Sequence, residues 1–169
     1  MMWQNISLKK DSTYIEKYVL TKEFVQELEK RYVLIFSGKQ RLAKNILKKT
    51  MDNVYEYSDA FCAINEIKKI TSQMDLAIKN QDVDLIGTLL NEHWVQSKKL
   101  CSTTTNNEIE KLLNVIEPYC QGMFICGAGG GGFLQIMLKK QYSVNHLREV
   151  LYKTGKKYTV YPIKIHMED

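Results

Sequence analysis

The amino-acid sequence predicts an α+β domain in which one antiparallel sheet carries its helices on one face. Several long segments repeat apolar side chains at steps of three and four residues, the period of an amphipathic helix. Short apolar runs rich in β-forming residues lie on either side of these segments and near the C-terminus. A chain of 169 residues with 44% hydrophobic and 25% charged residues also has the size and composition of one ordered globular domain.

The N-terminal part begins with a weak signal. Trp3, Ile6 and Leu8 alternate loosely, so residues 1–20 are expected to form an arm or an edge strand, and the domain proper is expected over residues 21–169. Thr21 is a suitable N-cap for a short helix in "KEFVQELEK". The run "YVLIFSG" then predicts a buried strand that ends in a glycine.

Long amphipathic helices are expected in the middle of the chain. The clearest one has an apolar face made by Leu42, Ala43, Ile46, Leu47, Met51 and Val54. Two more are expected over residues 60–79, with Phe61 on the inward face, and over residues 82–100. Asn80 and Gln81 form the turn between them, and Asp82 is the expected N-cap of the second.

The C-terminal third returns to strands. The polar "STTTNN" leads into a fourth long helix, "EIEKLLNVIEPY", which Pro118 ends. "GMFICGA" and "FLQIMLK" fit paired antiparallel strands, "SVNHLREVLYKTG" a helix with Gly155 at its C-cap, and "KYTVYPIKIH" a final strand. Strand, helices, strand, strand, helix, strand is the order of the ferredoxin-like split βαβ arrangement, here with a helical insertion after its first helix.

Composition narrows the classes of function. The net charge is +5, but the lysines are scattered among acids, which is typical of a solvated surface and not of a nucleic-acid footprint. Pairs such as Lys156-Lys157 leave open a weakly basic face that attracts anionic ligands. The four cysteines form no C-x-x-C pair and suggest free thiols. No apolar run approaches the ~20 residues of a membrane span, and no secretory signal is evident, so a cytoplasmic protein is expected.

The most unusual stretch is the loop of residues 127–132, which holds five of the nine glycines. Gly127-x-Gly129-x-x-Gly132 formally matches the dinucleotide pattern, but that fingerprint needs a following helix and a second parallel strand. A Walker-type phosphate loop is excluded because Phe133 stands where lysine is required. A plain hairpin turn needs only about two special residues. The excess of glycine therefore favours a site that needs positive φ, close approach or an anion nest.

Three stretches carry a family resemblance. "CGAGGGGFLQIML" resembles the third conserved motif of the GHMP kinases, which include galactokinase, homoserine kinase, mevalonate kinase and phosphomevalonate kinase. "YVLIFSGKQRLAKNIL" is similar to "LVYTGxxRLARNLL" of the L-fucose kinases and the bifunctional fucokinase/GDP-fucose pyrophosphorylases, and "LLNEHWVQSKKL" resembles their "LNxYWxQKKxM". The stretches span residues 32–138 in the family order.

The resemblance implies the C-terminal domain of an ATP-dependent sugar kinase, a phosphotransferase that acts on L-fucose or, failing that, on a heptose phosphate. GHMP kinases hold ATP between two domains, and their main phosphate loop, Pro-x-x-x-Gly-Leu-x-Ser-Ser, lies in the N-terminal domain and is absent here. ATP and Mg2+ are therefore expected to bind only together with an N-terminal kinase domain. The isolated chain is expected to be inactive, and the exposed interdomain face could mediate self-association.

The resemblance also nominates site residues. The loop that packs beside the phosphate loop and contributes to the nucleotide site comprises Gly127, Ala128, Gly129, Gly130, Gly131 and Gly132. Ser37, Gly38 and Arg41 match "TGxxRLA" and are candidates for sugar binding, with the equal alternative that Gly38 is only a turn and Arg41 a solvated side chain. No catalytic residue and no metal ligand is assigned.

Other conspicuous side chains have simpler interpretations. Trp94 matches the family motif but is expected to pack in the core or an interface. His93, His146 and His166 have no evident partner, and Cys126 is expected to be a buried apolar filler. The alternative function is a non-catalytic ferredoxin-like binding or regulatory module, in which the glycine loop is a docking surface.

Overall fold

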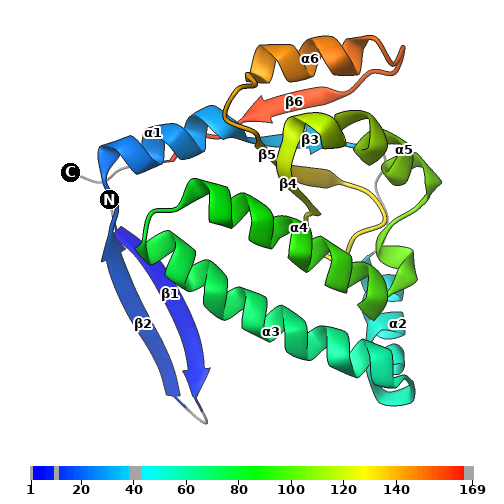
Figure 1. Ribbon diagram of the computed structural model, residues 1–169. Coiled ribbons are helices and arrows are strands. Elements are labelled where there is room, and N and C mark those ends of the chain that lie inside the picture. Colours follow the sequence, from blue (N-terminus) through cyan, green and yellow to red (C-terminus); the bar gives the residue numbers. More distant parts are fainter. Residues whose placement is uncertain (1, 10–11, 39–42, 166–169) are drawn as a thin grey trace.

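A computed structural model describes residues 2–9, 12–38 and 43–165 (Figure 1). The first half contains β1 (Met2–Lys9), β2 (Ser12–Val19), α1 (Lys22–Arg31), β3 (Tyr32–Phe36), α2 (Ala43–Glu56), α3 (Ser58–Lys79) and α4 (Val83–Leu100). The second half contains the 3-10 turn η1 (Ser102–Thr104), α5 (Asn107–Ile116), η2 (Glu117–Tyr119), β4 (Cys120–Ile125), β5 (Phe133–Leu138), α6 (Val144–Tyr152) and β6 (Thr159–Pro162).

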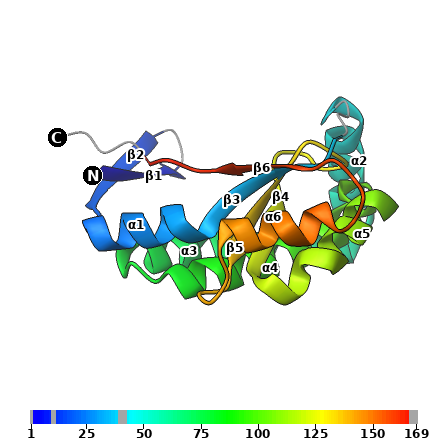
Figure 2. The ribbon, with the colours of Figure 1, turned by 90° about the horizontal axis from the view of Figure 1, so that it is seen from above.

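Strands β3 to β6 form one sheet in the order β4-β5-β3-β6, and every neighbouring pair is antiparallel. Helices α5 and α6 lie together on one side of this sheet (Figure 2). Val33 and Ile35 of β3 are fully buried and pack with Leu112 of α5 and Leu147 of α6 in one apolar cluster. The predicted α+β class with an antiparallel sheet is confirmed. The prediction that the helices lie on one face only is wrong, because side chains alternate along β5 and Met137, on the face opposite Ile136, packs with α1, α3 and α4.

A second apolar cluster joins α1, α3 and α4 to the sheet through Met137 of β5. Helix α4 contacts β4 at a pair of glycines, Gly87 and Gly122. A Cβ on Gly122 would lie far inside van der Waals contact of the Gly87 carbonyl oxygen. The two backbones meet here because neither residue has a side chain.

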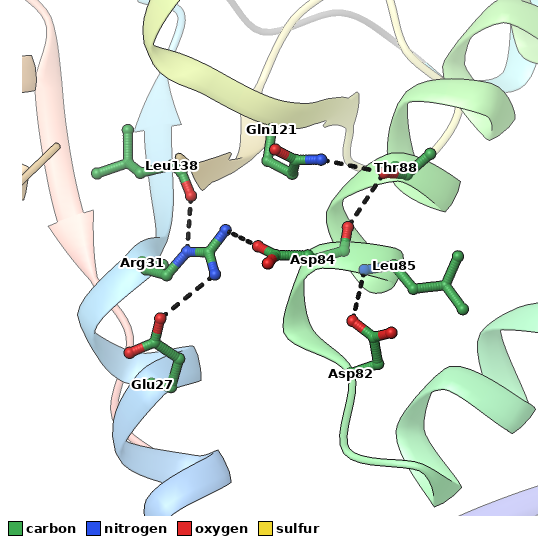
Figure 3. Close-up of polar contacts among 8 residues, drawn as sticks. All are labelled: Glu27, Arg31, Asp82, Asp84, Leu85, Thr88, Gln121 and Leu138. Carbon is green, nitrogen blue, oxygen red and sulfur yellow. Dashed lines mark hydrogen bonds and ion pairs between the residues drawn. The ribbon is translucent and has the colours of Figure 1, made fainter. Parts of the chain in front are cut away.

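One buried cation fastens these layers together. Arg31, the last residue of α1, is 1% exposed and donates from Nε to the carbonyl oxygen of Leu138 in β5 at 2.8 Å. Its two other nitrogens reach Asp84 of α4 at 2.6 Å and Glu27 of α1 at 3.3 Å (Figure 3). A fork-shaped, permanently charged guanidinium suits this triple role.

The N-terminal residues form neither a loose arm nor an edge strand of the main sheet. Strands β1 and β2 pair only with each other, from Met2 opposite Val19 to Lys9 opposite Ser12. The hairpin is tied to α3 through Tyr18, whose hydroxyl donates to Asp75 at 2.9 Å. Figure 1 shows the hairpin projecting beside α3.

The predicted N-caps of α1 and α4 are confirmed, and the predicted burial of several apolar side chains of α2 and α3 is not. The side chains of Thr21 and Asp82 cap α1 and α4 by accepting backbone hydrogen bonds. In contrast, Leu47 and Met51 of α2 are 55% and 61% exposed, and Phe61 of α3 is 56% exposed. Periodicity places apolar side chains on one face of a helix, but within the described part of the chain this face is covered only in part: Ile46 of α2 is 4% exposed, whereas Leu47 and Met51 are open to solvent.

Two C-terminal boundaries also differ from the prediction. The C-cap of α6 is Lys153, and Gly155 adopts a positive φ of 69° in the turn that follows. Strand β6 ends at Pro162, earlier than "KYTVYPIKIH" suggests. Proline has no backbone N–H to extend the ladder, which accounts for the early end.

Candidate functional site

The glycine loop joins β4 to β5 and needs glycine mainly for its own conformation. Positive φ angles of 71°, 91°, 73° and 86° occur at Gly127, Gly129, Gly130 and Gly132, a region that L side chains rarely adopt. Gly129 also lies so close to Thr104 of η1 that a Cβ would overlap that residue's backbone carbonyl. The excess of glycine that suggested a site is thus partly explained by contacts within this chain.

The loop is held in place by neighbours from distant parts of the sequence. Cys126 N donates to Phe133 O at 2.8 Å and closes the base of the loop. Ser37 N, after β3, donates to Gly132 O at 2.8 Å, and Gly130 N donates to Thr104 O at 2.6 Å. Asn106 donates from Nδ2 to Gly130 O at 3.0 Å. The loop is therefore anchored to both β3 and the start of α5.

A cavity of about 210 Å³ opens beside this anchored loop. Its lining residues come from four places in the sequence: the end of β3, the first turns of α5, the glycine loop and the α6–β6 connection. They are Ser37, Gly38, Asn106, Glu108, Ile109, Leu112, Gly130, Gly131, Lys156, Lys157 and Tyr158. The cavity brings the nominated residues Ser37 and Gly38 together with part of the nominated glycine loop.

The charges around the cavity leave a net positive lining. Lys156 donates from Nζ to Glu108 Oε2 at 2.5 Å, and this hydrogen bond raises the pKa of Lys156. Glu108 also faces Lys111 at 3.5 Å. Lys157 makes no ion pair or hydrogen bond within the described chain. Two lysines against one carboxylate therefore line the opening.

The nominated residues do not all contribute to the cavity. Four residues of the glycine loop do not line the cavity: Gly127, Ala128, Gly129 and Gly132. Arg41 lies outside the described residues. Lys156 and Lys157 were nominated only as one of several basic pairs, because their approach to the loop depends on the tertiary fold.

The sheet face opposite α5 and α6 carries partly exposed aromatic side chains. Phe36 and Phe133 lie across the β3–β5 pair with ring centroids 5.1 Å apart, and Phe133 lies 5.7 Å from Tyr161 of β6. Phe133 is 38% exposed and Tyr161 is 45% exposed. Tyr32 of β3 donates a hydrogen bond from its hydroxyl to Gln135. Burial raises the pKa of Tyr32 well above the ordinary value for tyrosine.

The remaining conspicuous residues have structural roles. Trp94 is buried in the main core beside Phe124, as expected. His93 does have a partner, Ser97 one turn later, with Nδ1 and Oγ 3.1 Å apart, and burial lowers its pKa. Cys126 is half-buried and not fully enclosed, with its sulfur 3.4 Å from Nε2 of Gln135.

The described residues offer neither a cluster of metal ligands nor a membrane-spanning helix. The described residues contain no group of three or more His, Cys, Asp or Glu side chains that could hold a metal ion. All four cysteines are free. Among the described helices, none combines the length and the apolar character needed to cross a bilayer.

Comparison with known proteins gives the same family as the sequence motifs. The chain is 31% identical over 132 residues to the bifunctional fucokinase/GDP-fucose pyrophosphorylase of Arabidopsis thaliana, an alignment that covers 76% of this chain and 12% of that protein. It is 29% identical over 121 residues to the L-fucokinase/L-fucose-1-P guanylyltransferase of Bacteroides fragilis, covering 71% of this chain and 13% of that protein. The chain thus spans about an eighth of these relatives. No family model matches the sequence.

Solved structures share the fold at low sequence identity. The mevalonate kinase of L. major superposes with a TM-score of 0.73 at 13% identity, over 94% of this chain and 48% of that one. The Lactococcus lactis galactokinase superposes with a TM-score of 0.62 at 16% identity, over 94% of this chain and 50% of that one. The predicted resemblance to the GHMP kinases is confirmed, and the antiparallel sheet with its helices matches the fold of these kinases.

Proposed function

We propose that this chain supplies the C-terminal domain of an ATP-dependent sugar kinase that acts on L-fucose. In this proposal the glycine loop forms one wall of a nucleotide and sugar cleft, and a second domain with the phosphate loop forms the other. The observation that carries the proposal is the single cavity where Ser37 and Gly38 meet Gly130 and Gly131. The likeness to two fucokinases supports the choice of sugar.

The fold supports the proposal through its strand order. The order β4-β5-β3-β6, with α6 between β5 and β6, is the order expected of a ferredoxin-like split βαβ unit, and in this proposal α2, α3 and α4 enlarge its first crossover. Helices α1, α3 and α4 cover the sheet face opposite α5 and α6 only at the end near Met137. Phe36, Phe133 and Tyr161 line that face here, where a second domain can cover them.

The exposed apolar side chains of α2 support a missing neighbour as well. Leu47, Met51 and Tyr55 follow each other at four-residue steps and are 55%, 61% and 85% exposed. An apolar stripe on a helix usually faces another element. In the proposed kinase, this stripe packs against the domain that carries the phosphate loop.

The size of the cavity also argues that a nucleotide needs a second domain to bind. Large ligands usually occupy cavities of roughly 300–1,000 Å³, and the cavity beside the loop measures about 210 Å³. It suits one small group and not a whole nucleotide. Phosphoryl transfer depends on positioning and on charge stabilisation by magnesium and cationic groups, so the isolated chain is expected to be inactive.

The experiment that tests this function is a domain exchange. The segment of the Bacteroides fragilis relative that aligns with this chain is replaced by residues 1–169, and ATP-dependent phosphorylation of L-fucose is measured. The chimera is expected to phosphorylate L-fucose, and the isolated chain is expected to show no turnover. A matched chimera with Gly129→Val, which places a side chain against Thr104 in a left-handed backbone position, is expected to lose activity.

Two results would contradict the proposal. Robust turnover by the isolated chain would show that no second domain is needed. A chimera that is folded, binds ATP and still phosphorylates no sugar would favour the non-catalytic binding or regulatory module.

A further inference from the structure

We propose that a second cavity, enclosed by α1, α3, α4 and the segment after β6, is a binding site for the hydrocarbon group of a small ligand. This cavity measures about 240 Å³, and it shares no described lining residue with the cavity beside the glycine loop. The chain builds the site alone, so binding there goes beyond the proposed function and depends neither on kinase activity nor on a second domain.

Three helices supply apolar walls. The cavity is lined by Phe24 and Leu28 of α1, Ile78 of α3, and Ile86 and Leu90 of α4. Phe24, Ile78 and Ile86 are buried members of the second apolar cluster, and Leu28 and Leu90 pack against it. These walls consist of aliphatic and aromatic carbon, which favours a ligand group without charge or hydrogen-bonding atoms.

The cavity offers few partners to water. Among its described lining residues, only Tyr32 of β3 has a polar side-chain group, and that hydroxyl already donates to Gln135. A buried water needs about two to four polar partners, and an empty void forfeits the contacts of the atoms that line it. A hydrocarbon group restores these contacts and leaves no polar atom unpaired.

The volume sets the size of the guest. Engineered apolar cavities of about 150 Å³ admit benzene, and pockets for drug-sized ligands begin at roughly 300 Å³. At about 240 Å³, this cavity lies between the two. It suits a compact group of about six to ten carbon atoms, such as one substituted ring or a branched chain.

One wall of the cavity is fastened by a single carboxylate. Ile163 and Ile165 line this wall, in a strap of residues 163–165 that follows β6 and forms neither helix nor strand. Figure 2 shows this part of the chain running alongside α1. Glu29 of α1 accepts from the backbone N–H of Ile165 at 2.6 Å and from Nζ of Lys164 at 3.1 Å. Release of Glu29 frees the strap, which gives a ligand a way in.

The test is a titration of the chain with benzene and cyclohexane, followed by the 13C methyl signals of its isoleucine and leucine residues. Saturable shifts are expected at Ile78, Ile86 and Ile163. The methyl groups of Ile109 and Ile116, which belong to the main apolar cluster, are expected not to move. The midpoint of thermal unfolding should also rise with the benzene concentration, because the probe binds the folded state.

A filling variant tests the location of the site. Leu90→Phe adds bulk to the wall and is expected to weaken benzene binding about 10-fold or more, because the probe loses buried contact area. Leu85→Phe makes the same change on the same helix, at an exposed residue outside the described lining, and is expected to leave the affinity unchanged. Circular dichroism checks the fold of each variant.

Two variants of α1 test the strap. Glu29→Ala removes the acceptor of Ile165 and Lys164 and is expected to raise the dissociation rate of benzene about 5-fold or more, the scale of one hydrogen bond. Glu23→Ala removes an exposed carboxylate from the first turn of the same helix and is expected to leave the rate unchanged. Because Glu29 lies outside the described lining, this pair remains decisive if Leu90→Phe does not fold.

The site would be ruled out by lining methyl groups that do not shift, by shifts of equal size in both apolar clusters, or by equal weakening in Leu90→Phe and Leu85→Phe. Equal dissociation rates in the two α1 variants would rule out the strap as the way in. A chain that binds no probe, together with a fucokinase chimera that Leu90→Phe inactivates, would assign the cavity to a side chain of the second domain instead.

Failure of this site is separable from failure of the kinase proposal. Saturable benzene binding with an inactive chimera would contradict only the proposed function. An active chimera without benzene binding would contradict only the hydrocarbon site.

Discussion

At the scale of single residues, Arg31 shows why a buried charge can be kept in a small domain. The guanidinium is 1% exposed, but all of its directions are used: a carbonyl of β5, a carboxylate of α4 and a carboxylate of its own helix. Asp84 and Glu27 keep contact with solvent, with side chains 58% and 28% exposed. They can hydrate if Arg31 is lost, whereas the Leu138 carbonyl oxygen cannot find another partner easily.

Arg31→Ala is therefore expected to lower the free energy of unfolding by about 2 kcal/mol, chiefly the cost of the buried carbonyl left without a donor and of the lost packing. Urea denaturation measures this change. Arg148→Ala is the matched control and is expected to cost less than about 0.5 kcal/mol, because this exposed guanidinium bonds to Asn145 at 3.0 Å and reaches the Val160 carbonyl oxygen only at 3.5 Å. Equal costs for both variants would contradict the role given to Arg31.

His93 is expected to make stability depend on pH. Burial lowers its pKa in the folded state below the value of about 6.5 that a histidine has when unfolded. Between these two pKa values the unfolded chain binds more protons, so stability rises with pH there. The contribution of His93 is complete above the unfolded pKa and is lost as the pH falls below about 6.5.

The urea concentration at the unfolding midpoint of the parent is accordingly expected to decrease as the pH is lowered from about 7.5 to about 5.5. His93→Gln is expected to make this decrease smaller. Glu92→Gln removes a neighbouring exposed charge and should leave the slope as it is in the parent. A slope unchanged by His93→Gln would show that other groups are responsible.

At the scale of elements, the α4–β4 contact depends on two glycines with unequal demands. A Cβ on Gly122 would meet the backbone of Gly87, which cannot move without shifting the helix. A Cβ on Gly87 would lie 2.6 Å from Cγ of Gln121 and 3.0 Å from Cγ of Met137, side-chain atoms that can shift more easily than a backbone carbonyl. Gly87 is also inside a helix, where alanine is favoured by about 1 kcal/mol.

Gly122→Ala is thus expected to cost about 3 kcal/mol or more of stability through overpacking, and Gly87→Ala less. Thermal or urea unfolding of the two variants measures the difference. Because both changes add one methyl group to the same contact, the pair controls for size and position. A larger loss for Gly87→Ala than for Gly122→Ala would contradict the packing seen here.

Local patterns predicted what depends on neighbours in sequence. The N-caps Thr21 and Asp82 and the antiparallel pair of β4 and β5 could be derived because capping and strand alternation are local. The approach of Lys156 and Lys157 to a loop about 25 residues earlier could not, since it depends on how α6 packs. The contact of Gly129 with Thr104, which explains one of the glycines, is tertiary in the same way.

At the scale of the whole molecule, the exposed stripe on α2 predicts association. Leu47, Met51 and Tyr55 place three apolar side chains in a row on a helix that contacts the rest of the fold chiefly through α3. Burying such side chains yields roughly 25 cal/mol per Å² of apolar surface. In the absence of a partner domain, a second copy of the chain is the available cover.

The chain is expected to self-associate as its concentration rises, and the triple variant Leu47→Gln, Met51→Gln and Tyr55→Gln is expected to weaken that association by about 10-fold or more. Sedimentation equilibrium measures both. The control replaces Leu76, Leu85 and Val95 by glutamine, which removes three side chains that are 55%, 39% and 42% exposed on α3 and α4.

In the fucokinase chimera, the α2 variant should also lower activity, because there the same stripe would face the phosphate-loop domain. A strictly monomeric parent at high concentration would count against the stripe as an interface between copies, and an α2 variant chimera with full activity would count against it as the interdomain face.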